Sequence, residues 1–305
     1  FHFPTMITNL RDAAIVTFLF QTLGFVISNF LQTETLYDIC GGINFLVLAI
    51  LGLMERIDSV TFEFLGLVPT IFTGLFVISR GWLLIFLAWR AHHRKGDARF
   101  QNVVGNPLLF WIYWMIQGCW VYIVSLPLLL TLLDNSTKFH SNEPMSVGSI
   151  ICLSGYFMGI ALEIVSDVQK TLWILQGRPG GFCRVGWWKY SRHPNYAGEI
   201  FQWWCAAALC PSWIGFASPF FTMLILLLAN GTGISDAEGK NLKRYYESKF
   251  CQEYERYRLE TSPLIPLIGY SSIPRSIQRF LLFEWERYEY HPPTKNRKLQ
   301  NKKDI

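Results

Sequence analysis

The octapeptide Arg-His-Pro-Asn-Tyr-Ala-Gly-Glu at 192–199 is the densest stretch of chemically active side chains in the sequence. Its proline suits the first turn of a helix, because the missing N–H would be unpaired there in any case. A helix that begins there places Asn195 and Glu199 one turn apart on one face. Arg192 and His193 then lie just before the helix N-terminus, where free N–H groups favour anions. The segment can therefore bind a phosphate and recognise a carboxamide, or it anchors the chain among lipid headgroups.

Further ionisable residues lie near the ends of long apolar runs, where charge is costly and needs a partner or a function. Asp38, at the start of the second run, is either a proton donor or a helix cap. Gln117, inside the fourth run, either bridges helices or touches a substrate. Two pairs of opposite charge are each either functional or a solvated ion pair of little energetic value: Asp97 with Arg99, and Asp167 with Lys170. The remaining single charges are Arg80, Arg90 and Glu163.

The elements that must position these residues are apolar helices. The 305-residue chain is 51% hydrophobic and only 16% charged, against about 25% charge in soluble domains. About 20 apolar residues in a helix cross the ~30 Å hydrocarbon core of a bilayer. We therefore expect an all-α, polytopic membrane bundle of about seven transmembrane helices, at 13–31, 38–54, 68–89, 107–133, 147–166, 195–210 and 213–233. The second and sixth runs are short, so they tilt or end on neighbouring helices.

The composition changes after residue 234, which divides the chain into three parts. Residues 1–234 form the predicted transmembrane domain. Residues 235–290 form a cytosolic helical segment, with a charged, Tyr-rich helix at 236–258 and an amphipathic helix on the membrane surface at 275–290. Residues 291–305 are polar and basic, which predicts a disordered tail.

The distribution of Lys and Arg predicts the orientation in the membrane. The loops at 90–99 and 167–193 are basic, whereas the intervening loop at 134–146 holds a single Lys. Basic loops stay in the cytosol, so the N-terminus is expected in the lumen and the C-terminus in the cytosol. The last four residues, Lys302-Lys303-Asp304-Ile305, resemble the dilysine retrieval signal of endoplasmic reticulum membrane proteins. Asn135 begins a glycosylation sequon in the loop predicted to be luminal.

Several function classes are disfavoured. The basic residues flank apolar runs where lipid headgroups would lie, which argues against nucleic acid as a partner. The seven cysteines form no CxxC pair and lie near no His cluster, so we expect no metal site. No GxGxxG is present, which excludes a Rossmann domain.

The octapeptide, followed by Trp203-Trp204, closely resembles a signature of the steroid 5-alpha-reductase-like superfamily, and most of all its uncharacterised domain-of-unknown-function branch. Two departures are visible: Ala197 stands where that branch usually has an aromatic residue, and Glu238 alone remains of its Pro-Leu-Leu-Glu element. Further elements resemble that branch in the same order and extend the resemblance over roughly 38–266: Asp38, the loop Gly96–Phe100, the helix from Pro107 to Pro127, Ser166–Lys170, Tyr254, Tyr257, Thr261 and Ile265-Pro266.

The resemblance implies a membrane-embedded, NADPH-dependent reductase of a C=C bond in a lipid or sterol. In such a reaction hydride reaches the beta carbon of an enone or enoyl group, and an acid polarises the carbonyl and supplies a proton. The candidates for that catalytic work are Asp38 and Gln117. The resemblance further implies that Asn195 contacts the nicotinamide amide with support from Glu199, and that the rest of the cofactor site comprises Arg90, Asp97, Arg99, Asp167, Lys170, Arg192, His193, Tyr196 and Glu238.

Two other functions remain open. Isoprenylcysteine-type methyltransferases also carry Arg-His-Pro-x-Tyr-x-Gly near a similar helix, but they use S-adenosylmethionine. Asn195 and the Asp-x-Gln-Lys element at 167–170 favour the reductase. The third possibility is a non-catalytic lipid-binding protein on the same fold, because fold does not fix function.

Overall fold

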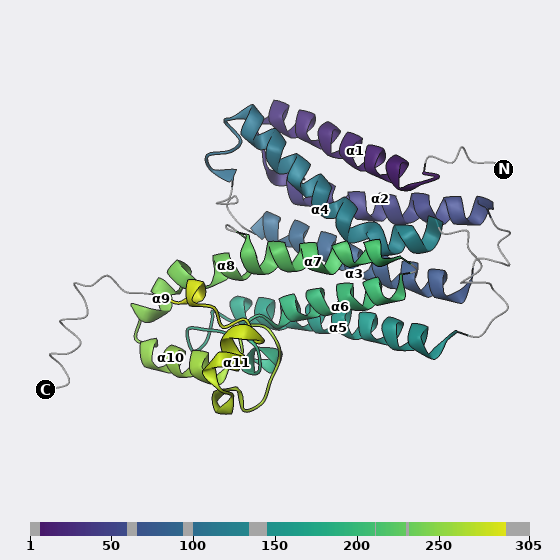
Figure 1. The fold of residues 1–305 in the computed structure, drawn as a ribbon. Helices are drawn as coiled ribbons and strands as arrows, with labels where there is room; N and C mark the ends of the chain where they lie inside the picture. The colour runs from purple at the N-terminus through teal and green to yellow at the C-terminus, as the bar shows by residue number, and fades with distance from the viewer. Residues whose placement is uncertain are drawn as a thin grey trace, which may run out of the picture. The chain divides into compact units, whose positions relative to one another are not determined.

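Helices and short helical turns make up the structure, a computed structural model, and they confirm the all-α prediction (Figure 1). The structure describes residues 7–59, 66–93, 100–133, 145–210, 212–229 and 232–290. Among these residues the only β-type pairing is an isolated bridge between Ser191 and Ser262. The predicted disordered tail, the dilysine sequence and the Asn135 sequon lie outside the described residues.

Long apolar helices confirm the first five predicted spans: α1 (Leu10–Leu31), α2 (Thr35–Ser59), α3 (Leu67–His93), α4 (Pro107–Leu133) and α5 (Val147–Leu175). Helix α5 continues nine residues beyond the predicted end at 166, so Asp167 and Lys170 lie on a helix rather than in a loop. A sixth segment of the described chain, Trp213–Ala237, is also long and apolar enough to cross a membrane.

The predicted sixth span forms α6 (Pro194–Leu209), which has only 16 residues. At about 1.5 Å per residue this helix is ~24 Å long, less than the ~30 Å of a hydrocarbon core. By length and composition, the described residues therefore contain six candidate spans, one fewer than predicted.

Whether α6 crosses the bilayer can be tested by labelling two positions. An odd number of crossings after residue 138 puts residues 138 and 298 on opposite faces, as the topology prediction requires. An even number puts them on the same face. We expect Lys138→Cys and Lys298→Cys to react with an impermeant thiol reagent from opposite sides of intact vesicles. Labelling of both from one side would show that α6 does not complete a crossing.

The chain divides into two compact units, and helices α5 and α6 contribute residues to both. Unit 1 comprises Phe1–Ile160 and Phe201–Thr222, and unit 2 comprises Ala161–Ile200 and Met223–Ile305. Unit 2 therefore combines the predicted C-terminal segment with helix ends that were assigned to the transmembrane domain.

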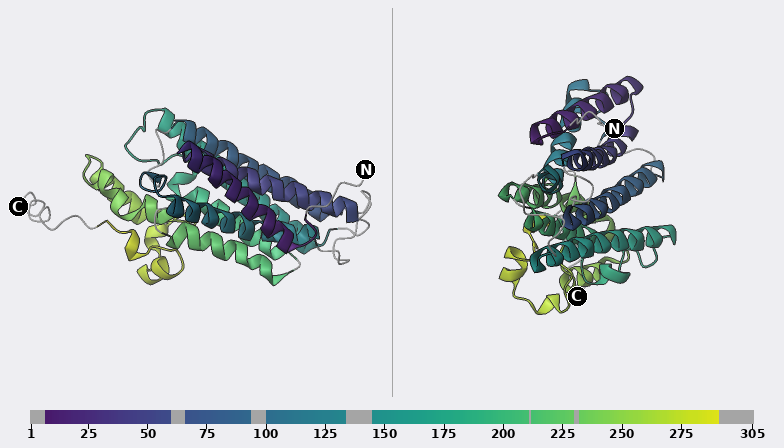
Figure 2. Two further views of the ribbon diagram at one scale, coloured as in Figure 1. Left: turned by 90° about the horizontal axis from the view of Figure 1, so that it is seen from above. Right: turned by 90° about the vertical axis from the view of Figure 1, so that its right-hand side faces the viewer.

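In unit 1, α1 and α4 each pack against α2, α1 packs against α4, and α2 packs against α3 (Figures 1 and 2). Small residues let these helices approach closely. A Cβ atom at Gly24 of α1 would lie 2.4 Å from the Trp114 ring of α4, and one at Gly118 would lie 2.9 Å from the ring of Phe18. The buried face of α1 is small or polar, whereas its exposed face carries large apolar residues such as Phe30, as a lipid-facing helix requires.

In unit 2 the predicted helix at 236–258 is broken into short pieces: α8 (Gly233–Ala237), η7 (Gly239–Leu242), α9 (Lys243–Tyr246) and α10 (Cys251–Glu260). Gly239 has a φ of +60°, a left-handed conformation that interrupts a helix and favours glycine. The predicted helix at 275–290 is also much shorter, because α11 (Arg275–Phe280) is followed by an irregular segment and the turn η9 (Glu286–Tyr288).

The last apolar segment changes helix type before unit 2 continues. Helix α7 (Ala217–Met223) passes into a π-helix, η6 (Leu224–Leu228). The hydroxyl of Tyr288 donates to the carbonyl of Leu227, and Arg287 donates to the carbonyl of Leu228 at 3.0 Å. These two side chains satisfy carbonyls at the end of the helix and join the end of the described chain to it.

Candidate functional site

Helix α6 begins at Pro194 within the octapeptide, as the sequence predicts. The residues just before Pro194 are hydrogen-bonded to the segment 262–264 of the same unit. The backbone N–H of Arg192 donates to the carbonyl of Ser262 at 2.8 Å, and the Ser191 hydroxyl donates to the carbonyl of Leu264 at 2.6 Å. The Ser191 oxygen also accepts from the N–H of His193 at 3.1 Å. These bonds fix the approach to α6, so Arg192 and His193 have defined positions.

The element at 166–170 lies on α5 and contacts the same stretch of chain. The Ser166 carbonyl accepts from the Trp188 indole at 3.0 Å, and Gln169 accepts from the N–H of Trp187 at 3.0 Å. The Lys170 ammonium lies over the Trp188 ring, 4.1 Å from its centroid. Gly186 is required here, because a Cβ atom would lie 2.2 Å from the amide of Gln169. Two motifs that are separate in sequence therefore form one structural element.

Asn195 has a half-satisfied carboxamide. Its Nδ2 donates to Oδ1 of Asp167 at 3.0 Å. Because a carboxylate only accepts hydrogen bonds, this contact fixes which end of the amide faces Asp167. The Asn195 Oδ1 atom is buried and has no hydrogen-bond partner among the residues that the structure describes. An unpaired buried acceptor costs about 1–3 kcal/mol, so an N–H group placed against this oxygen would be stabilising.

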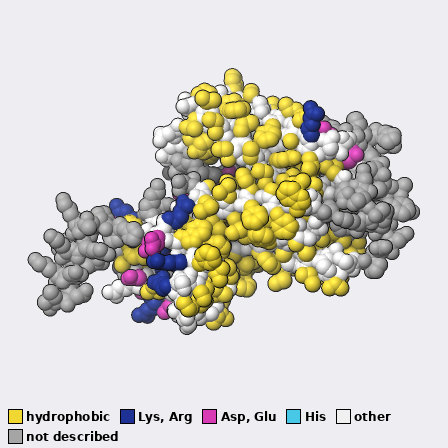
Figure 3. Space-filling model, viewed as in Figure 1, with side chains coloured by type: hydrophobic (Ala, Val, Ile, Leu, Met, Phe, Trp, Pro, Cys, Tyr) yellow, Lys and Arg dark blue, Asp and Glu magenta, His cyan; other side chains and the backbone are white. Residues whose placement is uncertain are grey.

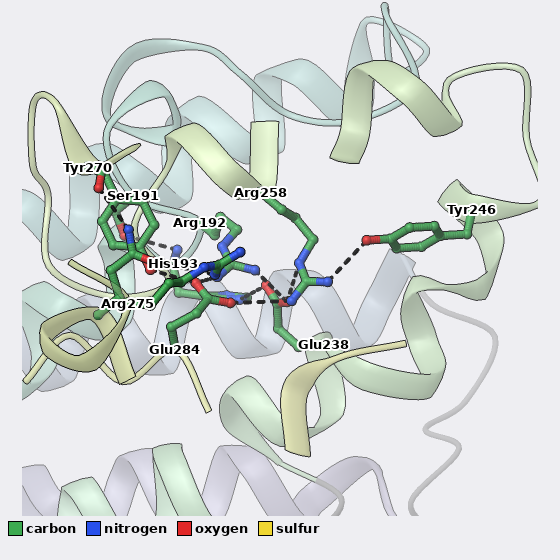
Figure 4. Close-up of polar contacts among 10 residues, drawn as sticks. Ser191, Arg192, His193, Glu238, Tyr246, Arg258, Tyr270, Arg275 and Glu284 are labelled. Carbon is green, nitrogen blue, oxygen red and sulfur yellow. Dashed lines mark hydrogen bonds and ion pairs between the residues drawn. The ribbon is translucent and has the colours of Figure 1, made fainter. Parts of the chain in front are cut away.

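Arg192 lies in a buried cluster of opposite charges rather than in an open anion site (Figure 4). Its guanidinium donates to Glu238 at 2.9 Å and to Glu284. Arg258 approaches the same two carboxylates, at 3.8 Å from Glu238 and 3.3 Å from Glu284. Tyr270 also donates to Glu284, at 2.8 Å. The side chains of Arg192 and Glu238 are each only 2% exposed, so this charge cluster is shielded from water.

The charge cluster keeps Glu238 and Arg192 ionised. Burial by itself raises the pKa of Glu238, but the positive charges of Arg192 and Arg258 and the hydrogen bond from His193 lower this pKa to about 2. Burial opposes the charge of Arg192, yet Glu238 and Glu284 raise the pKa of its guanidinium above the ordinary value. Glu238 therefore stays charged beside both arginines. The predicted contact of Arg192 with a cofactor stays a prediction.

His193 is neutral at pH 7 in this setting. Burial lowers the pKa of its imidazole, and the neighbouring Glu238 offsets only part of that effect. Its Nε2 lies 3.0 Å from Oε1 of Glu238 and must carry the proton, because the ionised carboxylate only accepts. The ring stacks on Tyr196 with centroids 5.5 Å apart. Glu199 lies one turn further along α6 and is half-buried.

The structure thus brings eight predicted site residues into unit 2: Asp167, Lys170, Arg192, His193, Asn195, Tyr196, Glu199 and Glu238. Asp38, Arg90 and Gln117 belong to unit 1. In that unit the amide of Gln117 lies against Gly41 of α2, where a Cβ atom would be 2.5 Å away. The predicted pair of Asp97 and Arg99 lies outside the described residues.

Three members of the charge cluster were not predicted: Arg258, Tyr270 and Glu284. Glu284 had a visible signal, because it is an acid with the apolar residues Leu281-Leu282-Phe283 before it and Trp285 after it. Arg258 follows the Tyr-x-x-Tyr pattern directly. Neither signal identifies the partner, since Arg192 is distant in sequence from both.

A family model described as a protein of unknown function (DUF1295) matches residues 24–261. The match spans most of the chain and includes the octapeptide, the element at 166–170 and Asp38. The chain belongs to this family. No curated protein and no solved structure matches this chain. Glu284 lies beyond the matched residues, so the charge cluster joins the family region to the segment that follows it.

Proposed function

We propose that this protein is a membrane-embedded, NADPH-dependent reductase of a C=C bond in a lipid or sterol. The observation that carries the proposal is the Asn195 carboxamide, which Asp167 orients so that one buried acceptor remains for a ligand. A nicotinamide carboxamide carries the N–H groups that such an acceptor needs. When bound, NADPH would supply the hydride.

Lys170 supports the proposal from the neighbouring turn of α5. Its ammonium lies over one face of the Trp188 ring, 4.1 Å from the ring centroid. We assign Lys170 to a diphosphate, whereas the guanidinium of Arg192 already binds two carboxylates. The likeness to the steroid 5-alpha-reductase-like superfamily is in keeping with this arrangement, and an endoplasmic reticulum location with a luminal N-terminus belongs to the same proposal.

The alternative cofactor is S-adenosylmethionine, and thermal stability in detergent separates the two. A ligand that binds only the folded state stabilises it by RT ln(1 + [L]/Kd), or about 2.7 kcal/mol at 100 times Kd. We expect NADPH to raise the melting temperature of the purified protein. We expect NADH to raise it less, because NADH lacks the 2′-phosphate that Lys and Arg would bind. If S-adenosylmethionine raises the melting temperature and NADPH does not, the protein is a methyltransferase rather than a reductase. If neither ligand changes the melting temperature, a non-catalytic lipid-binding protein is favoured.

A further inference from the structure

We propose that unit 2 carries a membrane-docking surface, formed by residues 185–190 and 262–281, that binds anionic lipid headgroups. Large apolar side chains project from both segments. Ile268 is 88% exposed and Phe280 is 84% exposed. Trp187 and Tyr190, of the first segment, are also exposed. So many exposed large side chains in two short segments indicate an interaction surface.

Backbone and side-chain hydrogen bonds tie the two segments together. The N–H of Leu267 donates to the carbonyl of Tyr190 at 3.1 Å. The isolated bridge between Ser191 and Ser262 lies next to this bond. Trp187 and Tyr190 pack edge to face, with ring centroids 6.4 Å apart. The docking surface is therefore a single structural feature although its parts are distant in sequence.

The geometry of 262–281 is held from within, so its apolar side chains are exposed by a defined structure. Gln278 is buried, and its amide donates to the carbonyls of Tyr270 and Ile273 at 2.9 and 3.0 Å. Tyr270 is in turn bonded to Glu284 of the charge cluster. The fold thus holds the side chains of Ile268 and Phe280 in exposed positions on the protein surface.

The charges of the docking surface identify a lipid bilayer as the occupant. Neither segment contains Asp or Glu, and their ionised side chains are Lys189, Arg275 and Arg279. Arg279 pairs with Glu286 at 3.0 Å, a contact exposed to water. In Figure 3 hydrophobic side chains lie over the region of α11, and Lys and Arg side chains lie beside them together with some Asp and Glu side chains. Trp, Tyr, Lys and Arg with exposed Phe and Leu are the composition of an interfacial anchor.

A membrane-spanning helix of the same chain also keeps this surface near the bilayer. Unit 2 contains the last turns of α5, the candidate span Val147–Leu175. A second contact with a membrane that already holds the chain occurs at high effective concentration. Each Lys or Arg near an anionic surface adds about 1 kcal/mol. This proposal does not depend on the reductase assignment.

The experiment uses the full chain in vesicles of phosphatidylcholine and phosphatidylserine. An environment-sensitive fluorescent amino acid is placed at position 268, at 280, or at the matched control 252, an exposed Gln on α10 of the same unit. Lipids with a nitroxide near the headgroup serve as quenchers. We expect blue-shifted, quenched emission at 268 and 280 and unquenched emission at 252. Lys189→Gln with Arg275→Gln should reduce quenching at 280.

Three outcomes would overturn the docking proposal. Emission at 268 and 280 that matches the control at 252 would place the surface in water. Blue-shifted emission that the nitroxide lipids do not quench, and that grows with the protein-to-lipid ratio, would point to a second copy of this chain as the occupant. Equal quenching in vesicles with and without phosphatidylserine would remove the anionic headgroup from the proposal. NADPH binding is not used in any arm, so these results are separate from the cofactor test.

Discussion

Arg192→Met should destabilise the protein more than any other single substitution in unit 2. The substitution leaves Glu238 and Glu284 buried with one arginine, Arg258, in place of two beside them. Removing one partner of a buried ion pair costs about 3–5 kcal/mol. At about 2–4 °C per kcal/mol, the melting temperature in detergent should fall by roughly 10 °C. The measurement is thermal unfolding followed by circular dichroism at pH 7.

An exposed ion pair in the same unit gives the matched control. Arg184 lies 3.3 Å from Glu253, and the two side chains are 48% and 57% exposed. Arg184→Met should change the free energy of unfolding by at most about 1 kcal/mol. Adding Glu284→Gln to Arg192→Met should restore part of the loss, because one uncompensated charge is removed. Equal effects of Arg192→Met and Arg184→Met would mean that the charge cluster is open to water.

Asn195→Ala should weaken NADPH binding without unfolding the protein. It removes the buried acceptor that we assign to the nicotinamide amide, and a lost buried hydrogen bond costs about 1–3 kcal/mol, or roughly 5- to 150-fold in Kd. Asp167→Asn should also weaken NADPH binding, but less strongly. The amide introduced at position 167 can both donate and accept hydrogen bonds, so it no longer fixes which end of the Asn195 carboxamide faces that position. Titration of NADPH by tryptophan fluorescence, with NADH as the reference, measures each Kd.

Two further variants separate binding from chemistry. Glu199→Gln keeps the shape of the side chain and removes its charge, so we expect it to weaken NADPH binding as Asn195→Ala does. Asp38→Asn should leave NADPH binding intact and abolish NADPH oxidation with a sterol enone, if Asp38 supplies the proton. Full activity of Asp38→Asn would move the proton donor to a Tyr or to water bound by Gln117. Unchanged NADPH affinity in Asn195→Ala would contradict the proposed site at its centre.

The amino-acid sequence by itself determined the class of protein and most of the helix positions. Apolar runs of about 20 residues have few stable solutions in a bilayer other than helices, and the first five predicted spans correspond to α1–α5. Proline at a helix start is likewise a local effect, so the beginning of α6 at Pro194 was predictable. The ends of helices were less predictable from the sequence. Helix α5 continues past residue 166, and there Ser166, Gln169 and Lys170 contact Trp187 and Trp188.

Only the tertiary structure decided the roles of the charged residues. Arg192 looked available to a phosphate, because a sequence shows a charge but not the groups that neutralise it. The folded chain places Glu238 and Glu284 against it from segments 46 and 92 residues away. The same holds for Asn195, whose orientation depends on Asp167, 28 residues earlier in the chain. Local propensities act over a few residues, whereas burial and electrostatic pairing depend on which distant segments meet, and those contacts set the chemistry of the site.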